Sequence, residues 1–299
     1  MTDAPILITG GSGQLARALD EAARAAGIAA VRVGRPEFDF DRLDSLDTLM
    51  RDHAPALVVN AAAYTAVDAA ETDEAAAYRA NRDGPARLAS LASAARIPLV
   101  HVSTDFVFDG RKGAPYAESD PTSPQGVYGA SKLAGEQAVL DSGARAMVLR
   151  TSWVHAPEGK NFVLTMLNAA RRTDRLRVVA DQKGCPTAAS DLAQAILAIA
   201  ARLRQTGWQD GYAGIFHAAG TGWTTWHGFA EAIFANAARH GMKAPVVEPI
   251  ATADWPTPTR RPADSRLDCA KLAATFGVRL PEWQGSLSRT IDEILTGRA

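Results

Sequence analysis

A tyrosine and a lysine four residues apart, Tyr128 and Lys132, have the side chains best suited to proton transfer in this sequence. The segment from Tyr128 to Val139 has a helical pattern, and residues four apart lie on one face of a helix. A phenol has a pKa of about 10, so it exchanges a proton at neutral pH only where a nearby cation favours the phenolate. Lys132 is such a cation, and the pair predicts proton transfer to or from a carbonyl or alcohol oxygen. A surface helix with an incidental tyrosine and lysine is the alternative.

Thr104 is a third candidate for the same chemistry. The segment Pro98 to Ser103 predicts a buried strand, and Thr104 and Asp105 follow at its C-terminal end, where open α/β sheets bind ligands. The Thr104 hydroxyl can donate to a carbonyl oxygen while Tyr128 delivers a proton, so a developing alkoxide meets two donors. Because no side chain donates a hydride, a reduction by Thr104, Tyr128 and Lys132 requires a cofactor.

A glycine turn near the N-terminus is the candidate cofactor site. Its pattern is GxxGxxA, at Gly10, Gly13 and Ala16, between a short apolar strand and an Ala-rich helix that ends at Gly27. Small residues let the backbone approach a pyrophosphate, and the N-terminus of the helix offers free N–H groups. A bare turn is the alternative, but the position after the first strand favours a dinucleotide.

Arg35 follows the second predicted strand, Ala30 to Val33, at the point where a site for NADH usually carries an acid. An arginine there suits the 2′-phosphate of NADPH. Asp39 is close enough in sequence to meet an adenine or ribose edge. The sequence therefore favours NADPH, with NADH as the second candidate, unless Arg35 is only a solvated loop charge.

Strand and helix patterns alternate along the first half of the chain. Ala56 to Val59 predicts a third buried strand, a long helical pattern runs from Glu71 to Ala95, and Ala146 to Arg150 predicts a further strand. This order predicts an α/β fold with a parallel sheet whose strand ends share one edge.

Length, charge and composition exclude several classes of protein. The 299 residues suffice for one large α/β domain or for a dominant domain with a smaller lobe, and 32 Lys plus Arg nearly balance 33 Asp plus Glu. This balance argues against nucleic acid and anionic membranes as partners. The two cysteines and six histidines lack the spacing of a metal site, and no apolar run approaches the roughly 18 residues of a membrane helix. We expect no catalytic metal, no membrane segment and a cytoplasmic location.

Three sites in the second half carry side chains suited to a ligand. Trp153 follows the strand at Ala146 to Arg150 and can wall a sugar ring or fill the core. Asn161 begins an amphipathic helix, so its amide can cap that helix or contact a ligand. Arg260 and Arg261 lie in a Pro-rich loop, where they suit a diphosphate or form a solvated charge pair.

The glycine turn, the Tyr128/Lys132 pair and the Thr104 strand end together resemble the extended short-chain dehydrogenases/reductases, and within them the dTDP-4-dehydrorhamnose reductase family. The segments that carry the resemblance cover most of the chain: GGSGQL at 10–15, VVNAAAYTAVDAAE at 58–71, STDFVFDG at 103–110, YGASKLAGE at 128–136, RTSWV at 150–154, GKNFVLTML at 159–167, DQKGCPT at 181–187 and WPTPTRRPADSRLD at 255–268.

The resemblance implies a Rossmann-type doubly wound parallel sheet in an NAD(P)-binding domain at residues 1–151. Residues 152–299 would mainly form a smaller substrate-binding lobe, with some segments returning to the sheet. The implied reaction is the NADPH-dependent reduction of the C4 keto group of dTDP-4-dehydro-L-rhamnose. The implied partner is a nucleotide-sugar substrate, and we expect a monomer or a homodimer.

The family's pattern also implies roles for individual residues. Lys132 is expected to lower the pKa of Tyr128 and to hold the nicotinamide ribose. Cofactor contacts would come from Gln14, Leu15, Asp39, Phe40, Ala62, Ala63, Thr65, Tyr128 and Lys132, beside the turn glycines. Sugar contacts would come from Thr104, Asp105 and Trp153, with Asn161 and Arg261 near the diphosphate.

Three residues depart from the family's pattern. Phe106 and His155 stand where tyrosine is common, which leaves the details of the sugar pocket open. Ala18 replaces a glutamate that helps some members bind Mg²⁺ between subunits, so we expect no metal-bridged dimer. Two other functions stay open. One is a reductase or epimerase of a different nucleotide-sugar. The other is a non-catalytic NADP-binding regulatory subunit, like that of methionine adenosyltransferase, which resembles this family.

Overall fold

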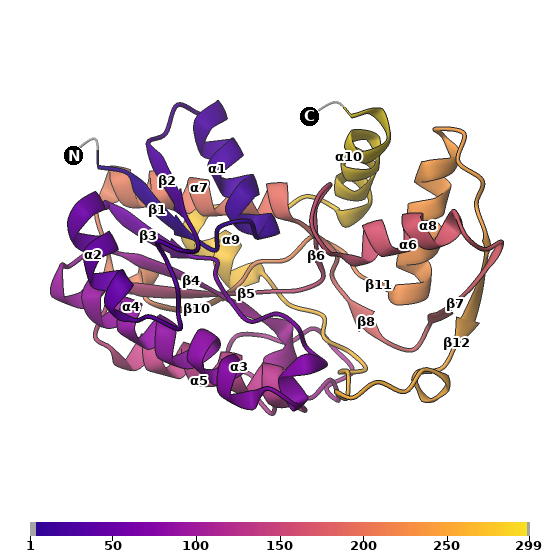
Figure 1. The fold of residues 1–299 in the computed structure, drawn as a ribbon, viewed down its shortest axis with the longest axis horizontal. Coiled ribbons are helices and arrows are strands. Elements are labelled where there is room, and N and C mark those ends of the chain that lie inside the picture. Colours follow the sequence, from indigo (N-terminus) through magenta and orange to yellow (C-terminus); the bar gives the residue numbers. More distant parts are fainter. Residues whose placement is uncertain (1–3, 298–299) are drawn as a thin grey trace.

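The computed structural model describes residues 4–297, which form a sheet-based lobe and a smaller helical lobe beside it (Figure 1). The sheet has six parallel strands in the order β10-β5-β4-β3-β1-β2. Their bounds are β1 Ile6–Thr9, β2 Ala30–Val33, β3 Leu57–Asn60, β4 Leu99–Thr104, β5 Ala146–Thr151 and β10 Gly214–His217. The predicted doubly wound α/β fold is therefore confirmed.

Helices cover both faces of the sheet, as the continuous apolar strands require. One face carries α1 (Gln14–Ala25), α7 (Ala189–Thr206) and α9 (Ala270–Phe276), and the other carries α2 (Asp44–His53), α4 (Gly84–Ala94) and α5 (Val127–Asp141). The strand residues Leu7 and Ile8 are fully buried, and burying one aliphatic side chain of this size contributes about 1.5–3 kcal/mol. Two cores, one on each side of the sheet, hold the strand ends in place.

The smaller lobe has a core of its own. Its helices are α6 (Phe162–Ala170), α8 (Trp226–Ala238) and α10 (Trp283–Thr296), which pack around Phe229 and Trp283. Three two-stranded sheets complete it: β6 (Val154–His155) with β9 (Thr187–Ala188), β8 (Lys183–Gly184) with β11 (Thr224–Thr225), and β7 (Arg175–Val179) with β12 (Val246–Ile250). Short 3₁₀ turns lie at Ala69–Glu71, Asp105–Val107, Asp210–Tyr212 and Thr252–Asp254.

The register of the sheet brings the candidate residues to one edge. Thr104, the last residue of β4, pairs with Thr151 at the end of β5, and Thr9 pairs with both Val33 and Asn60. All five residues lie at the C-terminal ends of their strands, directly before the loops that carry the glycine turn, Arg35 and Asp105. The sheet therefore presents the predicted cofactor and catalytic segments side by side.

The prediction of one continuous helical segment from Glu71 to Ala95 is wrong. The structure has α3 (Glu74–Tyr78), a π-helical turn at Arg79–Asp83, and then α4. Pro85 has no N–H, so it cannot donate to the carbonyl of Asn81 as an α-helix requires. Gly135 of α5 lies against that carbonyl, since a Cβ there would be 1.9 Å from the Asn81 oxygen. The interruption is thus fixed by proline and by the close approach of α5.

A buried ion pair ties α5 to β5. Glu136 and Arg150 are 1% and 2% exposed, and Arg150 donates from Nη2 to Glu136 Oε2 at 2.6 Å and from Nε to Oε1 at 3.0 Å. Ser103 of β4 donates to the same carboxylate. Because Glu136 lies one helical turn beyond Lys132 on α5, its bonds to Arg150 and Ser103 fix to β5 and β4 the helix that carries the candidate catalytic lysine.

Candidate active site

Thr104, Tyr128 and Lys132 come together in the interior, at the end of β4 and the start of α5. Their exposed fractions are 6%, 9% and 2%. Thr104 Oγ1 donates to Asp105 Oδ1 at 3.1 Å, accepts from the Phe106 N–H at 3.2 Å, and forms a hydrogen bond with the Tyr128 hydroxyl. The two hydroxyls needed to meet one carbonyl oxygen are therefore adjacent.

The protonation of Tyr128 differs from the expectation. Burial raises the pKa of Tyr128 to about 12; the hydrogen bond with Thr104 opposes this change and the nearby Asp105 carboxylate adds to it. The expected lowering of the Tyr128 pKa by Lys132 is wrong here, because the Lys132 ammonium donates to the Val102 carbonyl at 2.7 Å. Tyr128 is consequently a phenol at neutral pH, the form that gives a proton to an alkoxide.

Lys132 is a cation in an apolar setting. Burial lowers the pKa of Lys132 to about 8, while the charge of Glu136, one helical turn further along α5, raises it. Its ammonium thus stays charged near neutral pH, but only by a small margin.

Asp105 joins the catalytic residues to the smaller lobe. Burial raises the pKa of the Asp105 carboxyl to about 7, and hydrogen bonds from Ser265 and Thr104 oppose this change. Its Oδ2 atom is buried without a hydrogen-bond partner among the described residues. A buried polar atom of this kind is suited to an acceptor or donor role toward a ligand hydroxyl.

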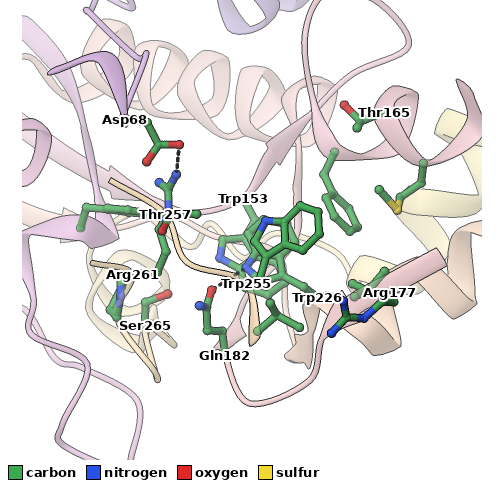
Figure 2. A pocket seen from close by; sticks show the side chains of 16 residues that line it. Asp68, Trp153, Thr165, Arg177, Gln182, Trp226, Trp255, Thr257, Arg261 and Ser265 are labelled. Carbon is green, nitrogen blue, oxygen red and sulfur yellow. Dashed lines mark hydrogen bonds and ion pairs between the residues drawn. The ribbon is translucent and has the colours of Figure 1, made fainter. Parts of the chain in front are cut away.

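A cavity of about 440 Å³ adjoins these residues (Figure 2). Phe106, one of its lining residues, packs edge-on against the Tyr128 ring at 5.6 Å between centroids. Thr104, Asp105, Tyr128 and Lys132 are absent from the cavity lining among the described residues, and Phe106 is the lining residue that contacts Tyr128. Six side chains define its character: Phe106, Trp153, Phe162, Gln182, Trp226 and Arg261.

Trp153 is a fixed wall of the cavity. Its backbone has a φ of +48°, and its indole stacks on Trp226 at 3.5 Å between centroids with 6° between the planes. On the other side a Cβ at Gly184 would lie 2.3 Å from the ring, so only glycine fits there. Trp226 donates from Nε1 to Gln182 Oε1 at 3.2 Å, which fixes the second indole (Figure 2).

Sequence reasoning missed Trp226, Phe162, Gln182 and Arg177 as cavity residues. None of them follows a strand of the main sheet, which was the signal that identified Thr104 and Trp153. Phe162 and Trp226 open helices α6 and α8, and their apolar patterns are equally typical of a core. An aromatic residue at the first position of two neighbouring helices was the available signal.

Arg261 and Asn161 have different surroundings. Arg261 lines the cavity, pairs with Asp68 at 2.8 Å and lies over the Phe106 ring. Asn161 caps α6 by accepting from the Leu164 N–H at 3.0 Å. Its amide nitrogen donates to Gln14 Oε1 at 2.8 Å and to backbone carbonyls, and it is absent from the cavity lining among the described residues. Arg260 is exposed and also lies outside that lining.

The glycine turn forms a crowded cradle that suits a pyrophosphate. Gly10 has a φ of +111°, and a Cβ on it would lie 3.0 Å from the Ala61 carbonyl. A Cβ on Gly34 would lie 2.6 Å from the Gly11 Cα, so β2 and the turn approach as closely as two backbones can. Gly13 precedes α1, whose first N–H groups face the turn without capping side chains.

The other expected cofactor residues divide into two groups. Ala62, Ala63 and Thr65 follow β3 beside the turn, and the Ala62 N–H donates to Asn60 Oδ1 at 3.3 Å. Leu15 and Phe40 are each 8% exposed and belong to the cores on opposite sides of the sheet.

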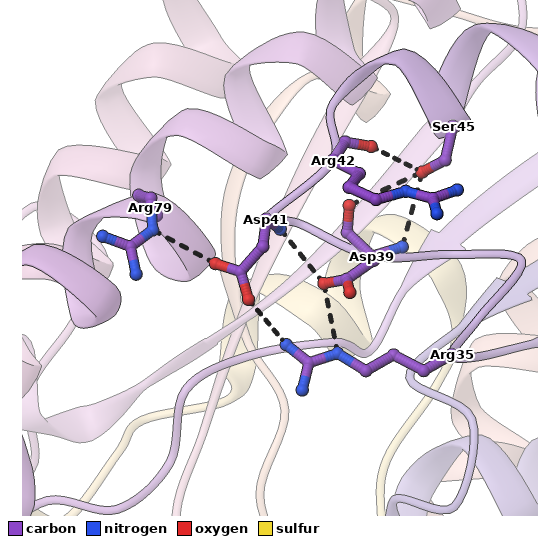
Figure 3. Close-up of polar contacts among 6 residues, drawn as sticks. All are labelled: Arg35, Asp39, Asp41, Arg42, Ser45 and Arg79. Atoms are coloured by element: carbon purple, nitrogen blue, oxygen red, sulfur yellow. Dashed lines mark hydrogen bonds and ion pairs between the residues drawn. The ribbon is translucent and has the colours of Figure 1, made fainter.

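Arg35 leaves the end of β2 toward two acids (Figure 3). Its Nε atom lies 3.1 Å from Asp39 Oδ1, and its Nη2 atom donates to Asp41 Oδ2 at 2.9 Å. The pKa of Asp39 is lowered, mainly by a hydrogen bond from the Asp41 N–H and further by Arg35. Both predicted residues, Arg35 and Asp39, thus lie together in the loop after β2, and their contact with a dinucleotide stays a prediction.

Within residues 4–297, no cluster of three or more His, Cys, Asp or Glu side chains is gathered for a metal ion. Over the same range, no helix has the length and apolar character needed to cross a membrane.

Comparison with known proteins gives the family. A model described as the RmlD substrate binding domain matches residues 4–296. A dTDP-4-dehydrorhamnose reductase from Sinorhizobium fredii is 44% identical over 290 residues, 97% of each chain. A probable dTDP-4,6-dihydroxy-2-methyloxan-3-one 4-ketoreductase from Streptomyces antibioticus is 39% identical over 294 residues, 97% of this chain and 95% of the relative.

A solved structure leads to the same conclusion. The dTDP-4-dehydrorhamnose reductase of Bacillus anthracis, in complex with NADP, has a TM-score of 0.88 and 31% identity, covering 98% of this chain and 100% of that one. Because the family model, the relatives and this structure all span nearly the whole chain, the protein belongs to the family of the RmlD substrate binding domain.

Proposed function

We propose that the protein reduces the C4 keto group of dTDP-4-dehydro-L-rhamnose to give dTDP-L-rhamnose, with NADPH as reductant. The observation that carries this proposal is the buried contact of Thr104 with Tyr128 beside a cavity walled by stacked indoles. The names of its relatives support the substrate, and the NADP of the Bacillus anthracis structure supports the cofactor.

The turn at Gly10 and Gly13 and the N-terminus of α1 would hold the pyrophosphate of NADPH. Ala62, Ala63 and Thr65, at the end of β3, lie where they would contact the rest of the dinucleotide. When bound, NADPH supplies the hydride that reduces C4. The other steps of the reaction would use side chains at the end of β4 and at the start of α5.

Tyr128 gives its phenolic proton to the C4 oxygen. The Thr104 hydroxyl donates a hydrogen bond to the same oxygen, so the developing negative charge is shared between two donors in a buried site. Lys132 places a positive charge near the phenolate that remains, and its position on α5 is set by the bond to the Val102 carbonyl. General acid catalysis of this kind contributes about 10²- to 10⁴-fold to the rate.

We infer that the cavity binds the nucleotide-sugar. The indoles of Trp153 and Trp226 line the cavity with apolar surface, and Arg261 offers a guanidinium to the diphosphate. Asp105, with its unpartnered Oδ2 atom, is placed to contact a sugar hydroxyl. This assignment makes residues 152–299 mainly a substrate-binding lobe. That division of the chain, a monomer or homodimer, and a cytoplasmic location stay predictions.

The deciding experiment follows NADPH absorbance with purified protein and dTDP-4-dehydro-L-rhamnose generated in place, beside a UDP-linked control. Oxidation with the dTDP substrate alone supports the proposal. Tyr128→Phe is expected to abolish turnover while binding NADPH as tightly as the wild type. No oxidation with the dTDP substrate, despite measurable NADPH binding, would refute the proposed reaction.

A second candidate is the same chemistry on a different dTDP-linked 4-keto sugar. The Streptomyces antibioticus relative favours it, because its name describes a 4-ketoreductase with another substrate at 39% identity. Competition between dTDP-4-dehydro-L-rhamnose and that relative's keto sugar, in one assay, distinguishes the two by their kcat/KM ratio. A non-catalytic regulatory role is disfavoured, since a buried Thr104, Tyr128 and Lys132 would have no purpose in it.

A further inference from the structure

The loop after β2 adjoins the glycine turn, so its side chains face the region where a dinucleotide places its adenosine ribose. The Gly11 N–H donates to the Val33 carbonyl at 2.9 Å, and Gly34 packs on Gly11. In folds of this type the residue at the end of the second strand distinguishes a ribose 2′-hydroxyl from a 2′-phosphate. Arg35 occupies that place, but its guanidinium is already paired.

Asp41 bridges two arginines from separate elements (Figure 3). Its Oδ2 atom accepts from Arg35 Nη2 at 2.9 Å, and its Oδ1 atom accepts from Arg79 Nε at 3.1 Å. Arg35 belongs to the loop after β2, whereas Arg79 is the first residue of the π-helical turn between α3 and α4. One carboxylate thus holds two guanidiniums together at the ribose position.

A carboxylate between two guanidiniums has the same contacts that protein arginines make with phosphate oxygens. A 2′-phosphate carries more negative charge than a carboxylate, and the same two cations would bind it. The side chains of Arg35, Asp41 and Arg79 are 71%, 51% and 49% exposed. Ion pairs exposed to this extent contribute only about 0–1 kcal/mol to stability. Exchange of Asp41 for an incoming phosphate therefore costs little.

On these contacts, and on the proposed use of NADPH, we propose that Asp41 competes with the 2′-phosphate for Arg35 and Arg79 and thereby sets the cofactor preference. With Asp41 present the preference for NADPH is weak, and NADH remains a usable cofactor. Asp39 keeps its own role, because it accepts from the Asp41 main-chain N–H at 3.0 Å, a bond that no change of the Asp41 side chain removes. Its Oδ1 atom also pairs with Arg35 Nε at 3.1 Å, so Asp39 keeps its contact with Arg35 when the Asp41 side chain is changed.

The test compares Asp41→Asn with the wild type by calorimetric titration of NADP⁺ and NAD⁺, without turnover. We expect NADP⁺ to bind about fivefold more tightly in the variant and NAD⁺ to change by less than twofold. The fragments 2′,5′-ADP and 5′-AMP should show the same contrast. Because the competition is electrostatic and exposed, the gain should shrink as salt is raised.

Two further variants make the result specific. Asp52→Asn removes the same charge from the same lobe, but Asp52 pairs with its neighbour Arg51 and not with Arg35. It should leave the NADP⁺ to NAD⁺ ratio unchanged. Arg79→Gln should weaken NADP⁺ and spare NAD⁺, because Arg79 is the second cation offered to the phosphate.

Each outcome decides a separate point. An unchanged ratio in Asp41→Asn, or an equal gain for both nucleotides, would overturn the assignment of Asp41 while leaving the proposed reaction intact. If the wild type binds neither NADP⁺ nor NAD⁺, the proposed function fails, and the inference on Asp41 fails with it.

Discussion

Asp105 is an acid buried beside the Thr104 hydroxyl, and burial raises the pKa of its carboxyl to about 7. Between the ordinary carboxyl pKa and this value, the folded protein keeps a proton that the unfolded chain has lost. The free energy of unfolding attributable to Asp105 therefore falls as the pH rises through this window. Above about pH 7 the contribution is constant again, because both states are ionised.

We predict that Asp105→Asn removes this pH dependence. The difference in unfolding free energy between variant and wild type should grow in the variant's favour from pH 5 to pH 7, by up to about 1.4 kcal/mol per pH unit. Urea denaturation at three pH values measures it. A constant difference across the range would show that Asp105 is ionised in the folded protein.

Gly184 allows a second prediction for a single residue. A Cβ at this position would meet the Trp153 indole at 2.3 Å, so Gly184→Ala must displace the ring that walls the cavity. We expect KM for the nucleotide-sugar to rise about tenfold, with NADPH binding unchanged; a displaced contact of this size costs about 1–3 kcal/mol. Gly211→Ala is the matched control, since nothing lies within 4 Å of its Cβ. Equal effects on both ligands would contradict the role of Gly184.

At this scale the sequence predicts residues that follow strands and misses residues that do not. Thr104, Asp105 and Trp153 were found because a parallel sheet gathers the C-terminal ends of its strands at one edge. Trp226 lies on α8, far from Trp153 in the sequence. Only the packing of the smaller lobe brings the two indoles together. The raised pKa of Tyr128 also required the structure, because burial depends on every surrounding element.

Among the secondary-structure elements, α5 has two tasks, since it carries Tyr128 and Lys132 and also closes one face of the sheet. Its attachment depends on the buried pair of Glu136 and Arg150 rather than on apolar contacts alone. Removing one member of such a pair leaves an uncompensated charge in the interior, which is far more costly than the net contribution of the pair itself.

Accordingly, Glu136→Ala should destabilise the protein by about 3–5 kcal/mol. Lys243→Ala is the comparison: its pair with Asp174 is 78% exposed on both sides, and its loss should cost less than about 1 kcal/mol. Chemical denaturation gives both values. Similar losses for the two variants would mean that the buried carboxylate finds compensation elsewhere.

Predicted elements agree with the structure where periodicity is strong and fail where a local contact intervenes. Five of the six strands of the sheet were predictable because short apolar runs bounded by turns have few other uses, whereas β10 was not predicted. The break between α3 and α4 depends on Gly135 approaching the Asn81 carbonyl from a helix some 50 residues away, a contact that no local pattern contains. Pro85 was the one local sign of it.

Taken as a whole, the molecule divides its work between two lobes: the sheet edge carries the proton donors, and the smaller lobe supplies the indoles of the cavity. Few side chains join the cofactor turn to the smaller lobe. Gln14, which follows the turn, accepts from Asn161 at the start of α6, and Arg17 pairs with Glu158. Asn161 caps the helix that begins with the cavity residue Phe162.

The hydrogen bond between Gln14 and Asn161 gives a route by which binding of the dinucleotide and binding of the nucleotide-sugar can be coupled. If a dinucleotide shifts Gln14, the N-terminus of α6 shifts with it, and linkage then requires each ligand to alter the affinity of the other by the same factor. We expect NADP⁺ to change the Kd for dTDP by a factor of about 5, and dTDP to change that for NADP⁺ equally. Gln14→Leu should abolish the factor while leaving Asn161 as the cap. Retention of the full factor in that variant would exclude this route. The bond between Gln14 and Asn161 therefore makes occupancy of the glycine turn and occupancy of the sugar lobe interdependent, whichever nucleotide binds first.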